Sequence, residues 1–352
     1  MNDYHYIGFD VHKAKIYYCV KTADGTVVEK GKFDNQREAV RAFAQRQKEP
    51  WKGVLEATLF SGWIWDELVQ SAAEMQMAHP LMVKAIQAAK HKSDKLDTDK
   101  LCDLVRCNWV PQCYVPPPQI RHLRRMLRWR EKVKRHAVQT KNRIGTTLME
   151  VGVSYCRAKL HGKKYFHTLL DGLKDVPAEV RLVLRHNRAL LEMFQSTQRQ
   201  ILKQLQNHPQ LQERVKLLRT IPAIGLITAL TWALEGGQPE RFSSIRKAVS
   251  YSGLVSGQDQ SGEQQRSGPL SKQRNPYLQA ALIEAAKLSP RLHPHWAEFY
   301  ARKIAQGATP NQATIAIARK MVAYLLAVDR SRKPFQLPNK VDSSVSESAA
   351  GA

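Results

Sequence analysis

The stretch that decides the fold lies close to the N-terminus and reads Tyr6-Ile7-Gly8-Phe9-Asp10-Val11-His12-Lys13. Its apolar side chains alternate with small or polar ones, which is the two-residue period of a half-buried strand, and Asp10 stands where this strand should end. Residues 15–22 and 25–33 read as two further strands, separated by an Asp-Gly turn signal. The sequence therefore predicts a three-stranded meander with a carboxylate on its first strand. A lone Asp at such a place is usually a simple cap, so its meaning depends on the acids that follow.

Two helices and two strands should complete this first α/β unit. Helical periodicity covers 36–47, a short buried strand at 52–58 carries Glu56, and a helix at 62–70 precedes a strand-like segment at 76–79. The resulting order, β-β-β-α-β-α-β, is how ribonuclease-H-like nuclease folds begin. In such folds the first and fourth strands lie side by side, so the carboxylates of Asp10 and Glu56 would meet.

Two more acids, Asp94 and Asp97, lie in the stretch Lys92-Ser93-Asp94-Lys95-Leu96-Asp97-Thr98-Asp99-Lys100. Because they are three residues apart, a helix that begins here stacks them on one face. Capping and helix-dipole complementarity would explain one or two of these acids. They do not explain four acids that converge from separate elements, and a cluster of carboxylate oxygens suits Mg²⁺ or Mn²⁺. Two such ions roughly 4 Å apart would clamp the attacking and leaving oxygens of a phosphodiester.

The charge balance points to a polyanionic partner. Among 352 residues, 55 are Lys or Arg and 31 are Asp or Glu, which gives a formal net charge of +24. Nucleic acid is the default candidate for such a surplus, and a membrane surface is the competing interpretation. No apolar run reaches the roughly 18 residues of a membrane span, and no N-terminal signal peptide is visible. We therefore expect a cytoplasmic protein that has no membrane partner.

The five cysteines are odd in number and contain no CxxC pair. A zinc site built from His91, Cys102, Cys107 and Cys113 is conceivable, but these spacings fit no standard zinc knuckle. Reduced thiols in a cytoplasmic protein are the favoured interpretation.

After Pro116-Pro117-Pro118, which cannot continue a strand or a helix, the sequence becomes helical and very basic. Six cations spaced i, i+3, i+4, i+7, i+11 and i+14 form a stripe on one face of the expected helix: Arg121, Arg124, Arg125, Arg128, Lys132 and Arg135. A charge run is usually a solvated face, but a run of one sign repels itself unless a polyanion lies on it. We therefore expect this stripe to contact nucleic-acid phosphates.

The remaining chain reads as mainly helical. Residues 177–206 keep a heptad-like apolar spacing, which predicts an antiparallel stalk with the basic helix, or a coiled coil for dimerisation. An ordinary amphipathic helix that packs on its own domain fits equally well. Residues 217–229 resemble a helix-hairpin-helix, whose turn would aim helix amides at a phosphate, and the polar segment 255–276 reads as a mobile linker or a binding hairpin. Its interleaved cations are further candidate nucleic-acid contacts: Arg266, Lys272 and Arg274.

These patterns divide the chain into four expected parts. Residues 1–117 form the α/β unit with the acids, 118–210 a basic helical region, and 211–332 a mainly helical C-terminal domain. The Ser/Ala/Gly-rich segment 333–352 reads as a disordered tail.

The acidic motifs together resemble the signatures of DEDD-type insertion-sequence transposases. They are Gly8-Phe9-Asp10-Val11-His12-Lys13, Leu55-Glu56-Ala57-Thr58 and Lys92-Ser93-Asp94-Lys95-Leu96-Asp97. This family is related to the Piv and MooV DNA invertases, and its N-terminal domain is similar to the RuvC Holliday-junction resolvase. Its C-terminal transposase domain is matched by Ile221-Pro222-Ala223-Ile224-Gly225, Arg241-Phe242, Tyr251-Ser252-Gly253-Leu254, Gln260-Ser261-Gly262 and Ser271-Lys272. The resemblance spans about residues 4–330, and two domain signatures in series make it specific.

The resemblance implies a RuvC-like α/β domain, a coiled-coil stalk and a helical C-terminal domain with a catalytic serine. It assigns a Mg²⁺-binding catalytic tetrad to Asp10, Glu56, Asp94 and Asp97. The family's nucleophilic serine lies in a Ser-Gly pair, which here is Ser261-Gly262, although Ser256-Gly257 is a second such pair. The family usually has Gly where Ala223 stands. The implied partners are donor and target DNA, a structured non-coding guide RNA encoded by the element, and other copies of the chain in a homodimer or homotetramer. The implied location is the bacterial cytoplasm, in association with the nucleoid.

Three functional hypotheses follow. In the first, a recombinase uses Ser261 to form a covalent phosphoserine and then rejoins DNA strands. In the second, the carboxylates activate water in a Mg²⁺-dependent junction-resolving nuclease, and Ser261 is only a loop residue. In the third, the protein binds nucleic acid without catalysis. The products distinguish the first two, because hydrolysis leaves free ends whereas transesterification leaves protein-linked ends and rejoined strands.

Overall fold

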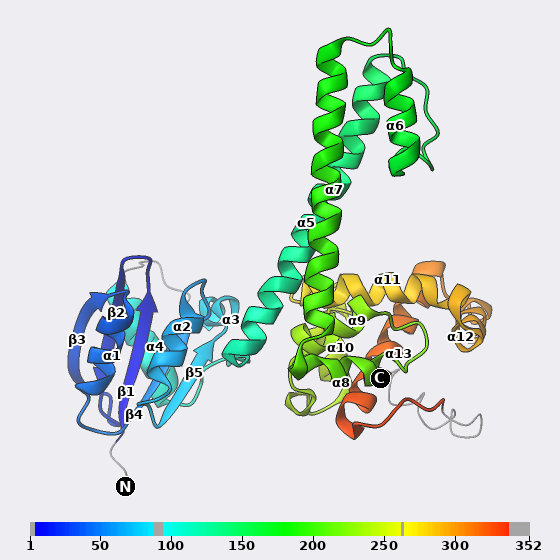
Figure 1. The fold of residues 1–352 in the computed structure, drawn as a ribbon. Helices are drawn as coiled ribbons and strands as arrows, with labels where there is room; N and C mark the ends of the chain where they lie inside the picture. Colours follow the sequence, from blue (N-terminus) through cyan, green and yellow to red (C-terminus); the bar gives the residue numbers. More distant parts are fainter. Residues whose placement is uncertain (1–3, 87–93, 262–263, 338–352) are drawn as a thin grey trace. The chain divides into compact units, whose positions relative to one another are not determined.

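The computed structural model describes residues 4–86, 94–261 and 264–337. The chain forms two compact units that divide at Pro118 (Figure 1). Most of the expected tail, residues 338–352, lies outside the described residues.

The N-terminal unit is built on a five-stranded sheet with the order β3-β2-β1-β4-β5. Its strands are β1 (His5–Val11), β2 (Lys15–Lys21), β3 (Val27–Asp34), β4 (Trp51–Glu56) and β5 (Glu74–Ala78). The first three strands pair as an antiparallel meander, whereas β4 runs parallel to β1 and β5 runs parallel to β4. The predicted meander and the predicted adjacency of the first and fourth strands are therefore confirmed.

Helices cover both faces of this sheet. On one face, α1 (Arg37–Gln45) and α2 (Ser61–Leu68) pack Phe43 and Ile64 against Phe9 and Leu55 of the sheet. On the other face, α4 (Asp94–Arg106) packs Leu101 against Val54, and α3 (Pro80–Ile86) joins the same small core. Successive side chains of a strand point to opposite faces, so Leu55 and Val54 separate the two cores.

Helix α4 approaches the sheet closely at Gly8. A Cβ atom at this position would lie 2.5 Å from the carbonyl oxygen of Thr98 and 2.6 Å from the backbone nitrogen of Cys102. These distances are far inside van der Waals contact, so only glycine lets the helix backbone lie this close to β1. The small residue of the deciding stretch therefore fixes the position of α4.

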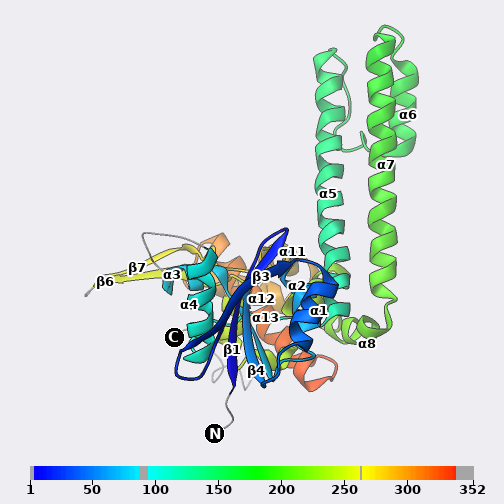
Figure 2. The same cartoon turned by 90° about the vertical axis from the view of Figure 1, so that its left-hand side faces the viewer.

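The C-terminal unit is mainly helical and contains one short hairpin. Two long helices, α5 (Pro118–Glu150) and α7 (Ala178–Gln206), run antiparallel as a stalk, and α6 (Lys163–Gly172) lies at its far end (Figure 2). The elements that follow are α8 (Pro209–Leu218), α9 (Leu226–Thr231), the π-helix η1 (Trp232–Gly236), the 3₁₀ helix η2 (Pro239–Arg241), α10 (Ile245–Tyr251), β6 (Ser256–Ser261), β7 (Gln264–Leu270), α11 (Pro276–Leu292), α12 (Pro294–Ala305) and α13 (Pro310–Ser331).

Separate cores hold the stalk at its two ends. At the far end, Ile144 of α5 and Leu184 of α7 pack with Phe166 of α6. At the base, Leu127 of α5 and Leu205 of α7 belong to the large core formed by the C-terminal helices. The antiparallel helix pair expected from the sequence is thus present, while dimerisation through it stays a prediction.

Two features of the C-terminal unit answer questions left by the sequence. The polar segment forms an antiparallel hairpin in which Ser256 pairs with Leu270 and Ser261 with Gln264, so the interpretation as a hairpin holds. Between α8 and α9, Ala223 adopts a positive φ of 66°. Glycine is the residue best suited to this region, so Ala223 adopts a conformation that is strained for a residue with a Cβ atom.

Candidate catalytic carboxylates and basic surface

The register of the sheet brings Asp10 and Glu56 to neighbouring positions. β1 and β4 are parallel, and the last paired residues are Phe9 and Leu55, so Asp10 and Glu56 follow them as the next residues on adjacent strands. Phe9 and Leu55 both point into the core beneath α1 and α2. Because side chains alternate along a strand, Asp10 and Glu56 are directed to the opposite face, which is the face that α4 covers.

Helix α4 runs along β1 in the opposite direction and carries its acidic start toward the same place. The Cys102 thiol donates to the carbonyl oxygen of Tyr6 at 2.9 Å, and Thr98, one turn earlier in the helix, lies over Gly8. The preceding turn holds Asp94 and Asp97, and it therefore approaches the end of β1 at Asp10. Asp97 is half-buried, whereas the side chain of Asp94 lies outside the described part of the structure.

The environment of Asp10 is polar and partly open to solvent. Its side chain is 23% exposed, and His12 Nε2 lies 3.1 Å from Asp10 Oδ2. Within residues 4–86, 94–261 and 264–337, no three His, Cys, Asp or Glu side chains are close enough together to hold a metal ion. The backbone nevertheless directs the ends of β1 and β4 and the start of α4 to one face of the sheet. Hard carboxylate oxygens are the donors that Mg²⁺ prefers.

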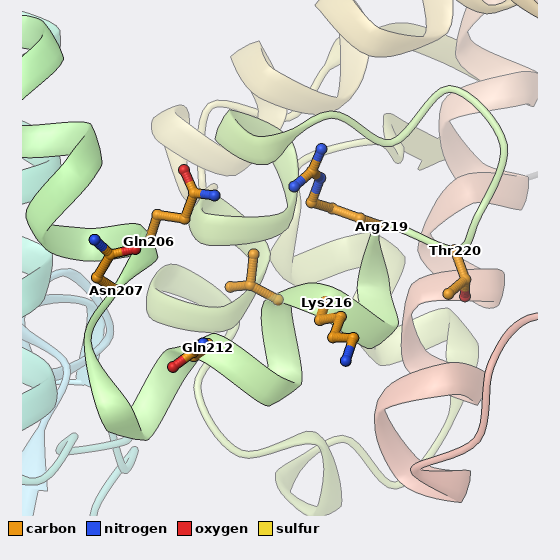
Figure 3. A pocket seen from close by; sticks show the side chains of 7 residues that line it. Gln206, Asn207, Gln212, Lys216, Arg219 and Thr220 are labelled. Atoms are coloured by element: carbon orange, nitrogen blue, oxygen red, sulfur yellow. The ribbon is translucent and has the colours of Figure 1, made fainter.

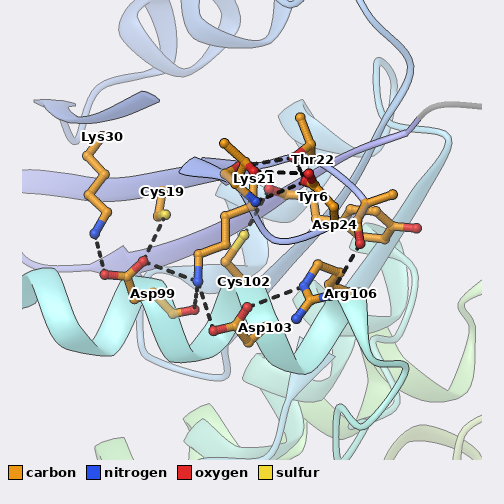
Figure 4. A network of polar contacts seen from close by, with 12 residues as sticks. Tyr6, Cys19, Lys21, Thr22, Asp24, Lys30, Asp99, Cys102, Asp103 and Arg106 are labelled. Carbon is orange, nitrogen blue, oxygen red and sulfur yellow. Dashed lines mark hydrogen bonds and ion pairs between the residues drawn. The ribbon is translucent and has the colours of Figure 1, made fainter. Parts of the chain in front are cut away.

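A polar network locks α4 onto the sheet (Figure 4). Lys21 of β2 pairs with Asp103 at 2.8 Å and with Asp99 at 3.3 Å, and Asp99 also accepts from Lys30 and from the Cys19 thiol. Burial alone would raise the pKa of Asp99, but the hydrogen bonds from Lys30, Cys19 and Lys21 outweigh it and lower the pKa. Asp99 therefore holds α4 against β2 and β3 of the sheet.

The two candidate serines stand at opposite ends of the C-terminal hairpin. Ser256 begins β6 and is half-buried, whereas Ser261 ends β6, next to the hairpin tip. The side chains of Ser261 and Arg266 lie outside the described part of the structure. The carboxylates belong to the N-terminal unit and both serines to the C-terminal one, so the role of either serine stays a prediction.

The predicted basic stripe on α5 divides into two groups. Arg128 forms a two-pronged ion pair with Glu235 at 2.7 and 2.8 Å, and Arg124 donates at 2.8 Å to the carbonyl oxygen of Leu234. Arg121 is half-buried, whereas the others of the stripe are exposed: Arg125, Lys132 and Arg135. On the C-terminal hairpin and its connection to α11, Lys272 is exposed, and the exposed Arg274 donates to the carbonyl oxygen of Ser271 at 3.1 Å.

Glu235 is a structurally important residue that the sequence did not reveal. Its side chain is fully buried on η1, and besides Arg128 it accepts from the amide of Asn275 at 2.9 Å. The hydrogen bond to Glu235 raises the pKa of Arg128. Asn275 also caps α11 by accepting from the backbone of Tyr277 and Leu278. Glu235 therefore ties the stalk helix to the residue that follows the hairpin. A lone acid in an apolar stretch downstream of an arginine-rich helix is the signal that could have indicated it.

A shallow pocket lies at the corner between α7 and α8 (Figure 3). It has a volume of about 400 Å³ and is lined by amide, hydroxyl and cationic side chains with one valine: Gln206, Asn207, Gln212, Val215, Lys216, Arg219 and Thr220. The lining holds no carboxylate, so its chemistry suits an anion and not a metal ion.

Comparison with known proteins identifies the class. The family DEDD_Tnp_IS110, described as a transposase, matches residues 7–152, and the Transposase IS116/IS110/IS902 family matches residues 215–301. The first match contains the acidic motifs and the second ends before α13. The chain is thus a transposase, an enzyme that acts on DNA. More narrowly, it belongs to the DEDD-type transposases of the IS110 family.

Individual relatives agree with this family. A protein of Pseudomonas aeruginosa named "Probable family 20 transposase" is 25% identical over 302 residues, which cover 83% of this chain and 88% of the relative. The transposase for insertion sequence element IS1328 of Yersinia enterocolitica is 26% identical over 225 residues, covering 62% of this chain and 65% of the relative. The pilin gene-inverting protein of Moraxella bovis is 35% identical over 131 residues, but these cover only 36% of this chain and 40% of the relative.

None of the helices in the described segments is long and apolar enough to cross a bilayer.

Proposed function

We propose that this transposase is a guide-RNA-directed DNA recombinase in which Ser261 forms a covalent phosphoserine beside a Mg²⁺-binding tetrad. The tetrad comprises Asp10, Glu56, Asp94 and Asp97. The observation that carries the proposal is the parallel register of β1 and β4, which brings Asp10 and Glu56 together on the face covered by α4. The match to the DEDD-type family over residues 7–152 supports it.

The donor set of this site fits Mg²⁺. Carboxylates from two adjacent strands and from a helix start supply several hard oxygens, and no thiolate is needed. Bound Mg²⁺ would polarise the scissile phosphate and stabilise the charge that develops on its oxygens. Asp10 and Glu56, which lie on adjacent strands, would hold the ions, with Asp94 and Asp97 of α4 completing the set.

The proposed strand transfer conserves phosphodiester bonds. The Ser261 hydroxyl oxygen attacks phosphorus and the bond to the 3′-oxygen breaks, which leaves a free 3′-hydroxyl and a 5′-phosphate esterified to Ser261. The serine loses its proton and the departing 3′-oxygen gains one. The 3′-hydroxyl of another strand then attacks the phosphoserine, which restores a phosphodiester and the serine hydroxyl. Since no bond energy is lost to water, the reaction requires no nucleotide cofactor.

A hydrolytic nuclease of the RuvC type is the second candidate. All four acids lie in the N-terminal unit, so water activation there would need no side chain from the C-terminal unit. The Moraxella relative named as a pilin gene-inverting protein favours rejoining over simple cleavage, because inversion of a DNA segment requires new strand connections.

The test follows the fate of the DNA ends. Ser261→Ala should abolish covalent protein–DNA adducts and rejoined strands while DNA and RNA binding persist, and Ser256→Ala, at the other end of β6, is the matched control. Asp10→Asn should lower all Mg²⁺-dependent strand breakage by roughly two orders of magnitude or more, with the exposed Asp34→Asn, which pairs with Lys15, as its control.

Each outcome selects one hypothesis. Adducts that persist in Ser261→Ala would move the nucleophile to another residue, Ser256 first. Free ends without adducts in the wild-type protein would establish the hydrolytic nuclease. Sequencing of RNA that copurifies with the protein tests the guide, and light scattering of the complex tests the homodimer or homotetramer.

A further inference from the structure

Trp129 is an exposed tryptophan in the middle of a regular helix. Its side chain is 52% exposed on α5, whereas Trp51, Trp232 and Trp296 are 0–2% exposed in the two cores. A large aromatic ring left in water forgoes the stabilisation that burial gives. The helix does not need Trp129 for its own packing, because Leu123 and Leu127 already fill the core beneath it.

Cations flank this ring along the helix. Arg125 lies four residues before Trp129 and Lys132 three residues after it, and these spacings place all three on one face. We call Arg125, Trp129 and Lys132 the outer face of α5. All three are exposed, and neither cation has a carboxylate partner among the residues that the structure describes. Glu131 lies elsewhere on the helix, where it pairs with Arg130 and Lys134.

The charge of the outer face selects its occupant. A second copy of the chain that used the same face would bring Arg125 and Lys132 against equal charges, which is repulsive. Duplex DNA offers phosphates, but its base faces are stacked and cannot cover an indole. An unpaired nucleotide offers both an aromatic face and flanking phosphates, and aromatic rings beside cations are the usual platform for single strands.

We propose that the outer face of α5 is a stacking platform for an unpaired RNA base, with Arg125 and Lys132 on the neighbouring phosphates. Folded RNA presents unstacked bases in loops and bulges before any reaction, whereas duplex DNA does not. This inference rests on the proposed function, because it deepens the assignment of RNA as a partner. According to this proposal, a contact near the base of the stalk distinguishes single-stranded from double-stranded nucleic acid.

The test measures binding of the full chain to three fluorescein-labelled probes in EDTA: a 20-nucleotide oligouridylate, a 20-base-pair RNA duplex and a 20-nucleotide oligothymidylate. Trp129→Ala should weaken oligouridylate binding on the order of 10- to 100-fold and duplex binding less than about twofold. Trp129→Phe should recover most of the affinity, since a ring that can stack remains. The slope of affinity against salt should not change in Trp129→Ala, because no phosphate contact is lost.

Trp109→Ala is the matched control, since Trp109 is also an exposed tryptophan (73%) but lies in the N-terminal unit; it should leave all three affinities unchanged. An equal loss on duplex and single strand, or no loss at all, would overturn the platform. A loss on oligothymidylate without a loss on oligouridylate would overturn the assignment to RNA, and a change in oligomeric state would assign the face to a second copy. Because Mg²⁺ is absent, these outcomes do not depend on Ser261 or the carboxylates, so the platform and the recombinase can fail separately.

Discussion

The two faces of α5 both carry cationic side chains, but these side chains have different surroundings. Arg124 and Arg128, the inner face, contact the buried Glu235 and the backbone of η1. Arg125 and Lys132 of the outer face are exposed. A rotation of about 100° around the helix separates Arg124 from Arg125, but Arg128 lies three residues from Arg125, on the same side of the helix. The reach of a side chain to Glu235, and not helical position alone, therefore decides whether a cation of α5 holds the fold or is exposed.

The inner face shows how a buried acid can be tolerated. A buried carboxylate is costly unless charges and hydrogen bonds compensate it. Glu235 has the two-pronged pair with Arg128, a longer contact of 3.5 Å with Arg124 and the amide of Asn275. These partners come from α5 and from the start of α11, so the ion pair fixes the geometry between the stalk and the C-terminal helices.

The largest effect should come from removal of the acid itself. Glu235→Ala removes the buried carboxylate that pairs with Arg128 at 2.7 Å and with Arg124 at 3.5 Å, and it also opens a cavity. We expect the C-terminal unit to lose about 3 kcal/mol of unfolding free energy, measured by urea denaturation followed by tryptophan fluorescence. Glu284→Ala is the control, because Glu284 is 68% exposed and its ion pair with Lys134 is long, at 3.7 Å. Equal destabilisation by both variants would contradict a structural role for Glu235.

A smaller effect should separate the two faces directly. Arg128→Ala leaves the carboxylate of Glu235 buried with only Arg124 and Asn275 as partners, and we expect a loss of about 2 kcal/mol. Arg125→Ala removes an exposed side chain from the same helix and should change stability by less than about 0.5 kcal/mol. The comparison is made in the same denaturation experiment. If Arg125→Ala proved as costly as Arg128→Ala, the distinction between the faces would be lost.

The sequence allowed prediction of those parts of the fold that depend on local periodicity. Alternating apolar residues and turn signals predicted the meander. The strand order then predicted that the first and fourth strands are neighbours, which their parallel pairing confirms. Gly8 belongs to the stretch that decides the fold, but the need for glycine there comes from a tertiary contact. The missing side chain makes room for the backbone of Thr98 and Cys102 in α4.

What could not be predicted depends on contacts between distant residues. Helical spacing placed six cations on one stripe, but it could not show that Glu235, 107 residues after Arg128, lies against part of it. For the same reason the spacing alone predicts a single nucleic-acid surface, although Arg124 and Arg128 have intramolecular partners. The exposure of the Trp129 ring could not be predicted either, because a tryptophan in an amphipathic helix normally belongs to its buried face.

The smallest effect on stability is expected for the variant that changes the salt dependence of nucleic-acid binding most. The double variant Arg125→Ala/Lys132→Ala should unfold like the wild type, yet the slope of log affinity against log salt for a single strand should fall by about 1.4, or roughly 0.7 for each lost phosphate contact. Arg128→Ala, compared under conditions where it remains folded, should keep the wild-type slope, because its guanidinium is already paired with Glu235. The measurement is a salt titration of fluorescence anisotropy. An unchanged slope in the double variant would make the outer face an ordinary solvated surface, and a reduced slope in Arg128→Ala would mean that the ion pair with Glu235 opens when nucleic acid binds.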